Sequence, residues 1–307
     1  MIVPNPLYPG ARVALVAPSS AVAADRLGPA QDAVKALGLE PVPYPSCYAT
    51  SRHGYFAADD AQRASDLQAA FADDSIDGVL CLRGGYGAHR LLPLLDLDAI
   101  ARRPKLFAGY SDITALHTAF NQICGFVTFH APMPASDYYQ PVDELTMSRL
   151  RRCLFGSLTG PVENPAGRPL TALSPGSAMG RLCGGNLSLL AASLGTPWEI
   201  DTKGKLLFLE DVGEKVYRID GMLTQLRNAG KFRDCAGVIL GDWTDCPPED
   251  PERSLTLEEV FRELIVPAGK PVLSDLACGH SLPNLSLPLG AMAAMDADTG
   301  RLEVLPS

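Results

Sequence analysis

The sequence places a serine at a junction between a strand and a helix, in the segment LFAGYSDITALHTAF. An apolar run ends at Tyr110 and a helical pattern begins near Asp112, so Ser111 lies at a sharp turn between them. A helix start offers unpaired N–H groups and a partial positive charge. Such a turn exposes a serine nucleophile beside an oxyanion site, as in a nucleophile elbow. The local pattern is G-x-S-D rather than G-x-S-x-G, so simple capping of the helix remains the alternative.

A serine nucleophile needs a base, and the chain has five histidines, at His53, His89, His117, His130 and His280. His280 lies in ACGHSLPNLSLPLG, a loop rich in Gly and Pro of the kind that presents functional groups. A structural role for His280 is the alternative. His117 falls within a helical pattern, His130 ends a strand where it could line a cleft, and the other two stand in polar surroundings typical of the surface.

A catalytic histidine needs a carboxylate that orients it, and acidic residues follow the apolar strand KLLFLE (205–210). Glu210 ends this strand, and open α/β sheets gather their sites at the carboxyl ends of strands. Asp211 and Glu214 have a simpler alternative explanation, because acidic residues favour the start of the helix that comes next, and we adopt this explanation for Glu214. Glu210 and Asp211 therefore remain as candidates at the end of this strand.

A glycine cluster, RGGYG (83–87), also follows a predicted strand. Its backbone can come close to a ligand, so a phosphate site, an N–H donor for an oxyanion and a plain tight turn all fit. No G-x-G-x-x-G or GK[ST] pattern is present, which leaves a nucleotide site weakly supported. The sequence has no HExxH motif and no Cys/His pair with metal spacing, so we expect no metal.

These candidates need a scaffold, and strand and helix patterns alternate through the first half of the chain. The strands are expected at 11–18, 77–83, 105–110 and 126–130, and the helices at 26–38, 59–73 and 112–124. This alternation predicts a parallel sheet with helices on both of its faces. In the second half, strands are expected at 205–210 and 237–243, a helix at 254–266, and a hairpin that turns at 298–300.

Pro and Gly recur between the two halves, around one helical segment near 143–155. We interpret residues 156–177 as a linker between an N-terminal domain, 1–155, and a C-terminal domain, 178–307. Ser111 then belongs to the first domain, whereas Glu210 and His280 belong to the second.

Composition excludes several classes of protein. The 307 residues carry a net charge of -9 and no Lys/Arg run, which argues against non-specific nucleic-acid binding and against an anionic membrane surface. No apolar run reaches the ~18 residues of a transmembrane helix, and no secretory signal is evident. The eight cysteines are scattered without a CxxC pair, which is typical of buried free thiols in a reducing cytoplasm.

Taken in order, several segments resemble the LD-carboxypeptidases, a serine peptidase family that also contains the microcin-C self-immunity hydrolases. They include GARVALVAPSS, LRGGYGAHRLL, FAGYSDITALH, GRLCGGNLSLLAASLGTPWEID, LLFLEDVGEKVYRIDGMLTQL and GHSLPNLSLPLGA. The resemblance runs along almost the whole chain. It implies an α/β fold, with an N-terminal doubly wound, flavodoxin-like domain whose sheet is mostly parallel. The C-terminal domain would hold a small β-barrel-like sheet with flanking helices.

The family's triad runs Ser, Glu, His in chain order, and the matching positions are Ser111 in GYSD, Glu210 in FLED and His280 in CGHS. The resemblance thus implies that Ser111 attacks, His280 shuttles the proton and Glu210 holds the imidazole, through an acyl-enzyme. It implies oxyanion donors at the backbone N–H groups of Asp112 and Gly85. No cofactor and no metal are implied.

Substrate contacts are expected from the same glycine turn, at Arg83, Gly84 and Tyr86. Within the family, the LGDWTDC stretch and the compact second half are closer to the murein tetrapeptide carboxypeptidases. The implied activity is release of the terminal D-alanine from cytoplasmic murein tetrapeptides by a homodimer. Two alternatives remain open: hydrolysis of peptidyl-adenylate antibiotics by the same triad, and a non-catalytic sensor of wall peptides.

Overall fold

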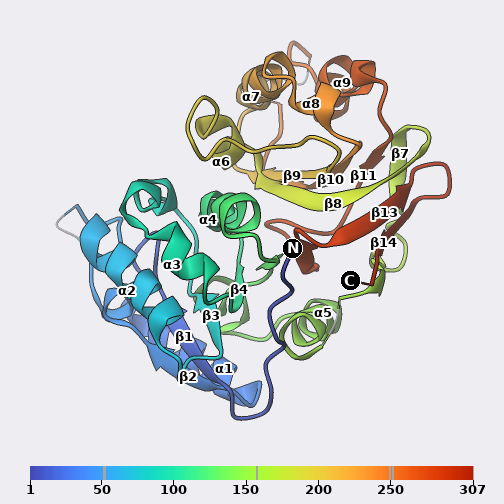
Figure 1. Ribbon diagram of the computed structural model, residues 1–307. Helices are drawn as coiled ribbons and strands as arrows, with labels where there is room; N and C mark the ends of the chain where they lie inside the picture. Colours follow the sequence, from blue (N-terminus) through green and yellow to red (C-terminus); the bar gives the residue numbers. More distant parts are fainter. Residues whose placement is uncertain (51–52, 157, 249, 251, 307) are drawn as a thin grey trace. The chain divides into compact units, whose positions relative to one another are not determined.

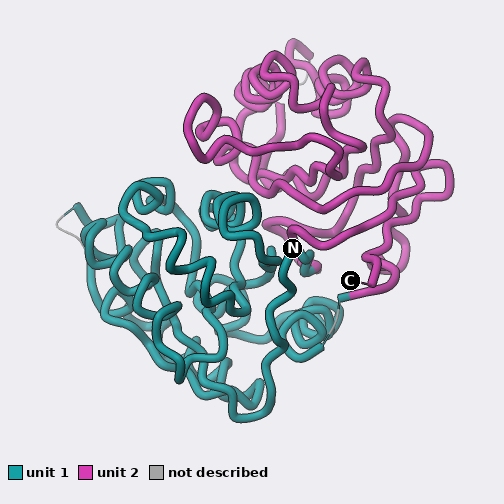
Figure 2. The backbone as a smooth tube through the Cα atoms, viewed as in Figure 1, with its two compact units in different colours: residues 1–158, 286–288 teal, residues 159–285, 289–307 magenta. Residues whose placement is uncertain are grey.

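The computed structural model describes residues 1–50, 53–156, 158–248, 250 and 252–306, and it divides the chain into two compact units (Figure 2). Unit 1 comprises Met1–Leu158 and Ser286–Pro288. Unit 2 comprises Thr159–Leu285 and Leu289–Ser307. Ser111 lies in the first unit, and Glu210 and His280 lie in the second.

Unit 1 is built on a six-stranded sheet with the order β12-β5-β4-β3-β1-β2. Its strands are β1 (Arg12–Val16), β2 (Glu40–Pro43), β3 (Gly78–Cys81), β4 (Leu106–Gly109), β5 (Thr128–His130) and β12 (Leu287–Leu289). The first five pair in parallel. The order 2-1-3-4-5 is that of flavodoxin-like sheets, so the expected doubly wound fold is confirmed.

Helices connect the parallel strands of unit 1, as parallel pairing requires (Figure 1). They are α1 (Ala24–Ala36), α2 (Asp60–Ala72), α3 (Leu97–Ala101) and α4 (Thr114–Ala119), whereas α5 (Glu144–Phe155) comes after the last of these strands. All residues of β3 and β4 are buried, as expected for strands covered on both faces. The carboxyl ends of these two strands lead directly into the glycine cluster and the serine turn.

The helix expected at 112–124 differs in detail. It is divided into a 3-10 turn, η4 (Ser111–Ile113), the helix α4 and a π-helical segment, η5 (Phe120–Cys124). Ile123, which the helical pattern assigns to the apolar face, is 45% exposed. The wider π turn rotates the residues that follow it, so the regular helical spacing no longer holds there.

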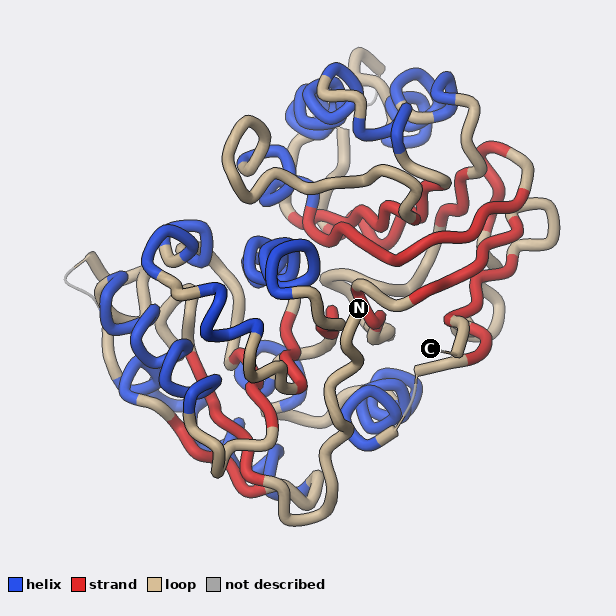
Figure 3. The backbone as a smooth tube through the Cα atoms, viewed as in Figure 1, coloured by secondary structure: helices blue, strands red, loops and turns tan. Residues whose placement is uncertain are grey.

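Unit 2 contains a mixed eight-stranded sheet with the order β6-β14-β13-β8-β9-β10-β11-β7. Strands are red in Figure 3. Its strands are β6 (Gly160–Pro161), β7 (Thr171–Ser174), β8 (Ser177–Asn186), β9 (Leu206–Val212), β10 (Gly237–Thr244), β11 (Val272–Ser274), β13 (Met292–Asp296) and β14 (Arg301–Val304). Strands β8 to β11 are parallel, and the outer strands pair antiparallel. The expected hairpin is confirmed by β13 and β14.

The helices of unit 2 lie over one face of its sheet (Figure 1). They are α6 (Leu187–Ala192), α7 (Val216–Asn228), α8 (Lys231–Asp234) and α9 (Leu257–Leu264). Leu207 and Leu209 of β9 pack into the apolar core beneath them. Because side chains alternate along a strand, Phe208 and Glu210 point to the opposite face. This alternation separates Glu210 from the helices.

The segment 156–177 is more structured than a linker. It carries β6, which pairs with β14, and β7, which pairs with β11. Its prolines and glycines still allow these short strands because both lie at the edges of the sheet. The compact units accordingly divide near residue 158, and the segment contributes to unit 2.

Two further features agree with the expectations from composition. All eight cysteines are free and buried. Within the described part of the chain, none of the helices combines the length and the apolar character that crossing a membrane requires.

Candidate active site

Ser111 occupies a strained position immediately after β4. The chain leaves the strand through Tyr110, which is extended, and Ser111 then adopts a positive φ of 65° as the first residue of the 3-10 turn. A left-handed conformation costs a non-glycine residue about 1–2 kcal/mol. Tyr110, and not Ser111, precedes the first helical turn, and no side chain caps it. The geometry therefore argues against the interpretation that Ser111 caps the helix.

The carboxylate of Asp112 anchors the serine turn from below. It is buried, and its Oδ2 accepts hydrogen bonds from Ser19 Oγ at 2.6 Å and from the backbone N–H of Ala88 at 2.7 Å. Burial raises the pKa of this carboxyl, and the bonds from Ser19 and Ala88 oppose the rise. The side chain of Asp112 thus ties the serine turn to the loop after β1 and to the end of the glycine cluster.

The glycine cluster lies against the serine. A Cβ on Gly84 would meet the Cβ of Ser111 at 2.8 Å and its Oγ at 3.0 Å, so a side chain has no room there. The same Cβ would lie 3.4 Å from the backbone nitrogen of Asp112, one of the two expected oxyanion donors. Gly85, the other, has a φ of +109° that L side chains rarely adopt, and it packs on Ser20. These contacts hold the turn close to the expected nucleophile.

Ser20 fixes the outer side of the same turn. Its backbone N–H donates to the carbonyl oxygen of Gly84 at 3.3 Å, and its Oγ accepts from the backbone N–H of Tyr86 at 3.1 Å. The ring of Tyr86 stacks on Phe56 but is 54% exposed. Tyr86 therefore presents an aromatic surface to solvent beside the turn, in keeping with the substrate contact that we expect from it.

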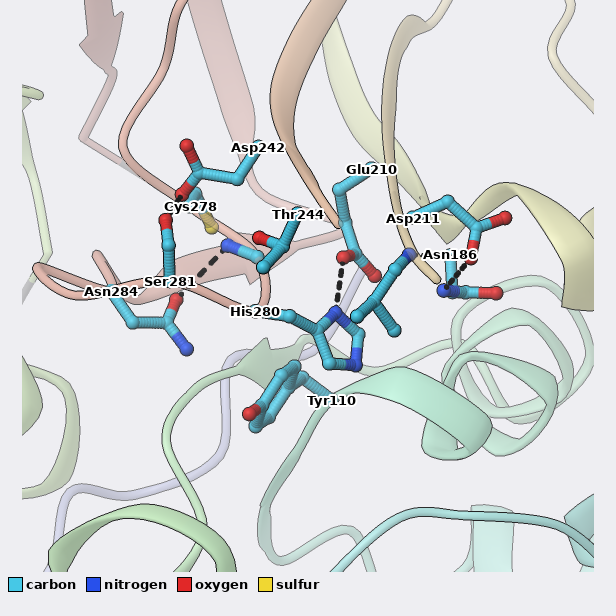
Figure 4. A network of polar contacts seen from close by, with 12 residues as sticks. Tyr110, Asn186, Glu210, Asp211, Asp242, Thr244, Cys278, His280, Ser281 and Asn284 are labelled. Carbon is cyan, nitrogen blue, oxygen red and sulfur yellow. Dashed lines mark hydrogen bonds and ion pairs between the residues drawn. The ribbon is translucent and has the colours of Figure 1, made fainter. Parts of the chain in front are cut away.

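In unit 2, His280 meets the carboxylate of Glu210 (Figure 4). The distance from His280 Nδ1 to Glu210 Oε2 is 2.7 Å. Glu210 is fully buried at the end of β9, and the side chain of His280 is 14% exposed. An Nδ1–H that donates to this carboxylate leaves Nε2 as the nitrogen able to accept a proton. Burial raises the pKa of Glu210, and the adjacent His280 opposes the rise.

The neighbouring acids point elsewhere. Glu214 pairs with Arg218 of α7, with its Oε2 2.6 Å from Arg218 Nε. Asp211 accepts from the backbone N–H and the hydroxyl of Ser188, at 3.0 and 2.7 Å, and from Asn186 Nδ2 at 2.9 Å. Support of the following helix is one alternative for Asp211, and these contacts do not favour it. Asp211 lies on the helix-covered side of β9 and its carboxylate holds the start of α6.

The loop that carries His280 is fixed by polar residues that sequence reasoning missed. Ser281 Oγ donates to Asp242 Oδ2 at 2.6 Å, and the backbone N–H of Asp242 donates to the carbonyl of Cys278 at 2.9 Å. The backbone N–H of Gly279 donates to Asn284 Oδ1 at 3.2 Å. The available signal was a polar residue, Asp242, at the end of a predicted apolar strand.

Gly279 brings this loop against the acid. A Cβ on Gly279 would lie 3.0 Å from Glu210 Oε2 and 3.1 Å from the Cβ of Asp242. Its φ of +148° lies outside the range that other residues readily adopt. The CGHS motif therefore needs its glycine for close approach as well as for backbone conformation.

The remaining histidines have structural or surface positions. His117 is fully buried between Thr128 Oγ1 at 2.9 Å and the carbonyl of Gly109 at 2.8 Å. Burial lowers its pKa to about 4, so it is neutral at physiological pH. His130 is fully buried at the end of β5, and His53 is exposed. Across the described residues, no group of three His, Cys, Asp or Glu side chains could hold a metal ion.

Comparison with known proteins agrees with the resemblance. The model of the LD-carboxypeptidase N-terminal domain matches residues 13–131, and that of the C-terminal domain matches residues 179–295. The chain is 43% identical to a probable murein peptide carboxypeptidase of Bacillus subtilis, over 95% of this chain and 91% of the relative. It is 33% identical to a murein tetrapeptide carboxypeptidase of Pseudomonas aeruginosa, over 94% of each.

A solved structure supports the same relationship. The crystal structure of a muramoyltetrapeptide carboxypeptidase from Oxalobacter formigenes superimposes with a TM-score of 0.84 at 29% identity, covering 96% of this chain and all of that one. Both domain models match in the expected order, and the relatives align over nearly their full lengths. The chain therefore belongs to the LD-carboxypeptidase family and is a peptidase of that type.

Proposed function

We propose that this enzyme releases the terminal D-alanine of murein tetrapeptides, using Ser111 as nucleophile, His280 as base and Glu210 as the carboxylate that orients the histidine. The observation that carries the proposal is the 2.7 Å contact between His280 Nδ1 and the buried Glu210. A histidine oriented in this way can act as the base for a nucleophile. Ser111 lies on a strained turn, and its GYSD segment matches the family's nucleophile motif.

The geometry of each unit supports a definite role for each group. Ser111 Oγ attacks the carbonyl carbon of the L-configured centre, and its proton passes to His280 Nε2. The carboxylate of Glu210 stabilises the imidazolium that forms. The backbone N–H groups of Asp112 and Gly85 donate to the oxyanion. His280 then protonates the amine of D-alanine as the C–N bond breaks, and water hydrolyses the acyl-enzyme through the same histidine.

The murein tetrapeptide is the substrate that the relatives favour. The names of the relatives from Bacillus subtilis and Pseudomonas aeruginosa specify a murein peptide and a murein tetrapeptide. The relative that bears on hydrolysis of a peptidyl-adenylate, a microcin C7 self-immunity protein of Escherichia coli, is less similar, at 28% identity over 79% of this chain. No observation favours non-catalytic binding of wall peptides. We propose further that the enzyme is cytoplasmic and forms a homodimer. Light scattering of the purified protein tests whether it is a dimer.

Mass spectrometry of murein tetrapeptide incubated with the pure protein tests the proposal. We expect conversion to the tripeptide with release of free D-alanine. The same peptide with L-alanine at its end should survive, and Ser111→Ala should leave both peptides intact. A parallel incubation with a peptidyl-adenylate tests whether the enzyme hydrolyses antibiotics of that class. Cleavage of the peptidyl-adenylate alone would support that alternative. Binding of the tetrapeptide without turnover would instead support the sensor.

A further inference from the structure

Arg83 is the first residue of the glycine cluster and lies two residues after the end of β3. The carboxyl ends of parallel strands are where open α/β sheets bind their ligands. Arg83 Nη1 donates to the carbonyl of Ala21 at 3.1 Å, which holds the side chain beside the turn. Its Nε is buried and has no hydrogen-bond partner within the described chain. Most of the guanidinium's hydrogen-bonding capacity is therefore unused.

The charge of Arg83 is also uncompensated. No carboxylate of the described residues forms an ion pair with it, although Arg63 and Arg90 both pair with Asp60. Burial lowers the pKa of Arg83, and the nearby positive charge of Arg26 lowers it further. Burying part of a cation without a counter-charge costs free energy. The position of Arg83 therefore favours the binding of an anionic ligand.

The glycine turn places this cation near the nucleophile. Arg83 Nη2 lies 3.7 Å from the position that a Cβ on Gly85 would take, whereas the Cβ position of Gly84 touches Ser111. Two adjacent residues thus connect the guanidinium with the serine. In a peptide, the scissile carbonyl carbon and the terminal carboxylate carbon are separated only by N and Cα, which is about 3–4 Å. A group that binds the terminal carboxylate must therefore lie close to the attacked bond.

We propose that Arg83 binds the terminal carboxylate of the peptide substrate and so restricts cleavage to the last bond. The inference rests on the proposed carboxypeptidase function and adds its specificity-determining residue. A guanidinium matches a carboxylate with two parallel N–H donors, whereas a neutral end of the chain offers no such partner. Without the carboxylate, the buried cation stays unpaired when substrate binds.

The test compares two substrates that differ only at this end: the tetrapeptide with free D-alanine and the same peptide ending in D-alaninamide. We expect the wild-type enzyme to prefer the free acid in kcat/KM by roughly 10- to 100-fold, the range of a hydrogen bond to a charged group. Arg83→Gln should lower kcat/KM for the free-acid peptide by that factor and leave kcat/KM for the amide peptide unchanged. Arg83→Lys, which keeps the charge but not the bidentate geometry, should restore part of the preference.

Arg90→Met provides the matched control, because Arg90 lies seven residues along the same region and already pairs with Asp60. It should keep the wild-type preference. Thermal melting of each variant verifies that it is folded. An Arg83→Gln enzyme that retains the preference for the acid overturns the inference, and so does an equal loss on both substrates. A wild-type enzyme that cleaves neither peptide refutes the proposed function itself, which is a different result.

Discussion

Replacing Glu210 with Gln separates the catalytic from the structural contribution of the buried acid. The change keeps the size of the side chain and leaves an oxygen that can accept the Nδ1–H of His280, but it removes the negative charge. That charge matters most when His280 carries a proton, which the proposed mechanism requires in the transition state. We therefore expect a large loss of kcat from a variant that folds normally.

The size of the loss follows from the contact distance. Two unit charges 2.7 Å apart attract by about 6 kcal/mol at an effective dielectric constant of about 20. An energy of this size in the transition state corresponds to about 10⁴-fold in rate. Replacement of the acid by its amide in another Ser-His-Asp triad has an effect of the same order.

The free energy of unfolding should change in the opposite direction from kcat: Glu210→Gln should lose activity but gain stability relative to wild type as pH rises. Burial raises the pKa of Glu210 in the folded protein above its ordinary value of 4.5. The folded state thus binds the proton of Glu210 more tightly than the unfolded state does. The stabilising effect is present below the unfolded pKa and is lost as pH rises through the folded pKa. Glu210→Gln should therefore gain free energy of unfolding relative to wild type as pH increases from 4 to 8.

The assay measures kcat on murein tetrapeptide and urea unfolding at several pH values, with Glu214→Gln as the control. Glu214 has the same charge and lies four residues further on, but its partner is Arg218 on α7, in an exposed pair worth about 0.3–0.5 kcal/mol. We expect this control to keep wild-type kcat. An active Glu210→Gln enzyme with an inactive Glu214→Gln enzyme would refute the reasoning, as would a stability difference that does not change with pH.

Three further predictions concern the residues around the site. Ser111→Gly should be inactive, like Ser111→Ala, but about 1 kcal/mol more stable than it in urea unfolding, because glycine tolerates the positive φ. Gly84→Ala should lower kcat by about 10² in steady-state kinetics, since its methyl group would displace Ser111; normal turnover would contradict this contact. Ser281→Ala should lower both kcat and the free energy of unfolding, by about 1.5–3 kcal/mol for the latter, because it removes the bond to Asp242.

The periodicity of the sequence predicts much of the first sheet because β1, β3, β4 and β5 are short apolar runs that helical segments follow. It cannot predict β12, whose three residues, Leu287–Leu289, join that sheet from far along the chain. It also misses the π turn at 120–124, since local composition does not record an extra residue in a turn. These elements depend on long-range packing rather than on local preference.

The candidate site shows the same division. Because side chains alternate along β9, the sequence already indicates that Glu210 and Leu209 point to opposite faces of the sheet. The contact that we expected between Glu210 and His280 is confirmed. The positive φ of Ser111 also agrees with a turn that a sequence motif can indicate. The histidine loop is anchored by Asp242 of β10, which bonds to Ser281, 39 positions further along the chain. It is also anchored by Asn284, which bonds to Gly279 within an irregular loop, so no periodic signal marks either contact.

The central claim is that Ser111 and His280, which come from different units, act as one catalytic group. A double-mutant cycle in kcat tests it most directly, with Ser111→Ala, His280→Ala and the double variant assayed on murein tetrapeptide. Residues that act together are strongly non-additive, so each single variant should lose nearly as much rate as the double variant. Losses that multiply, with the double variant slower by the product of the two single effects, would contradict the triad.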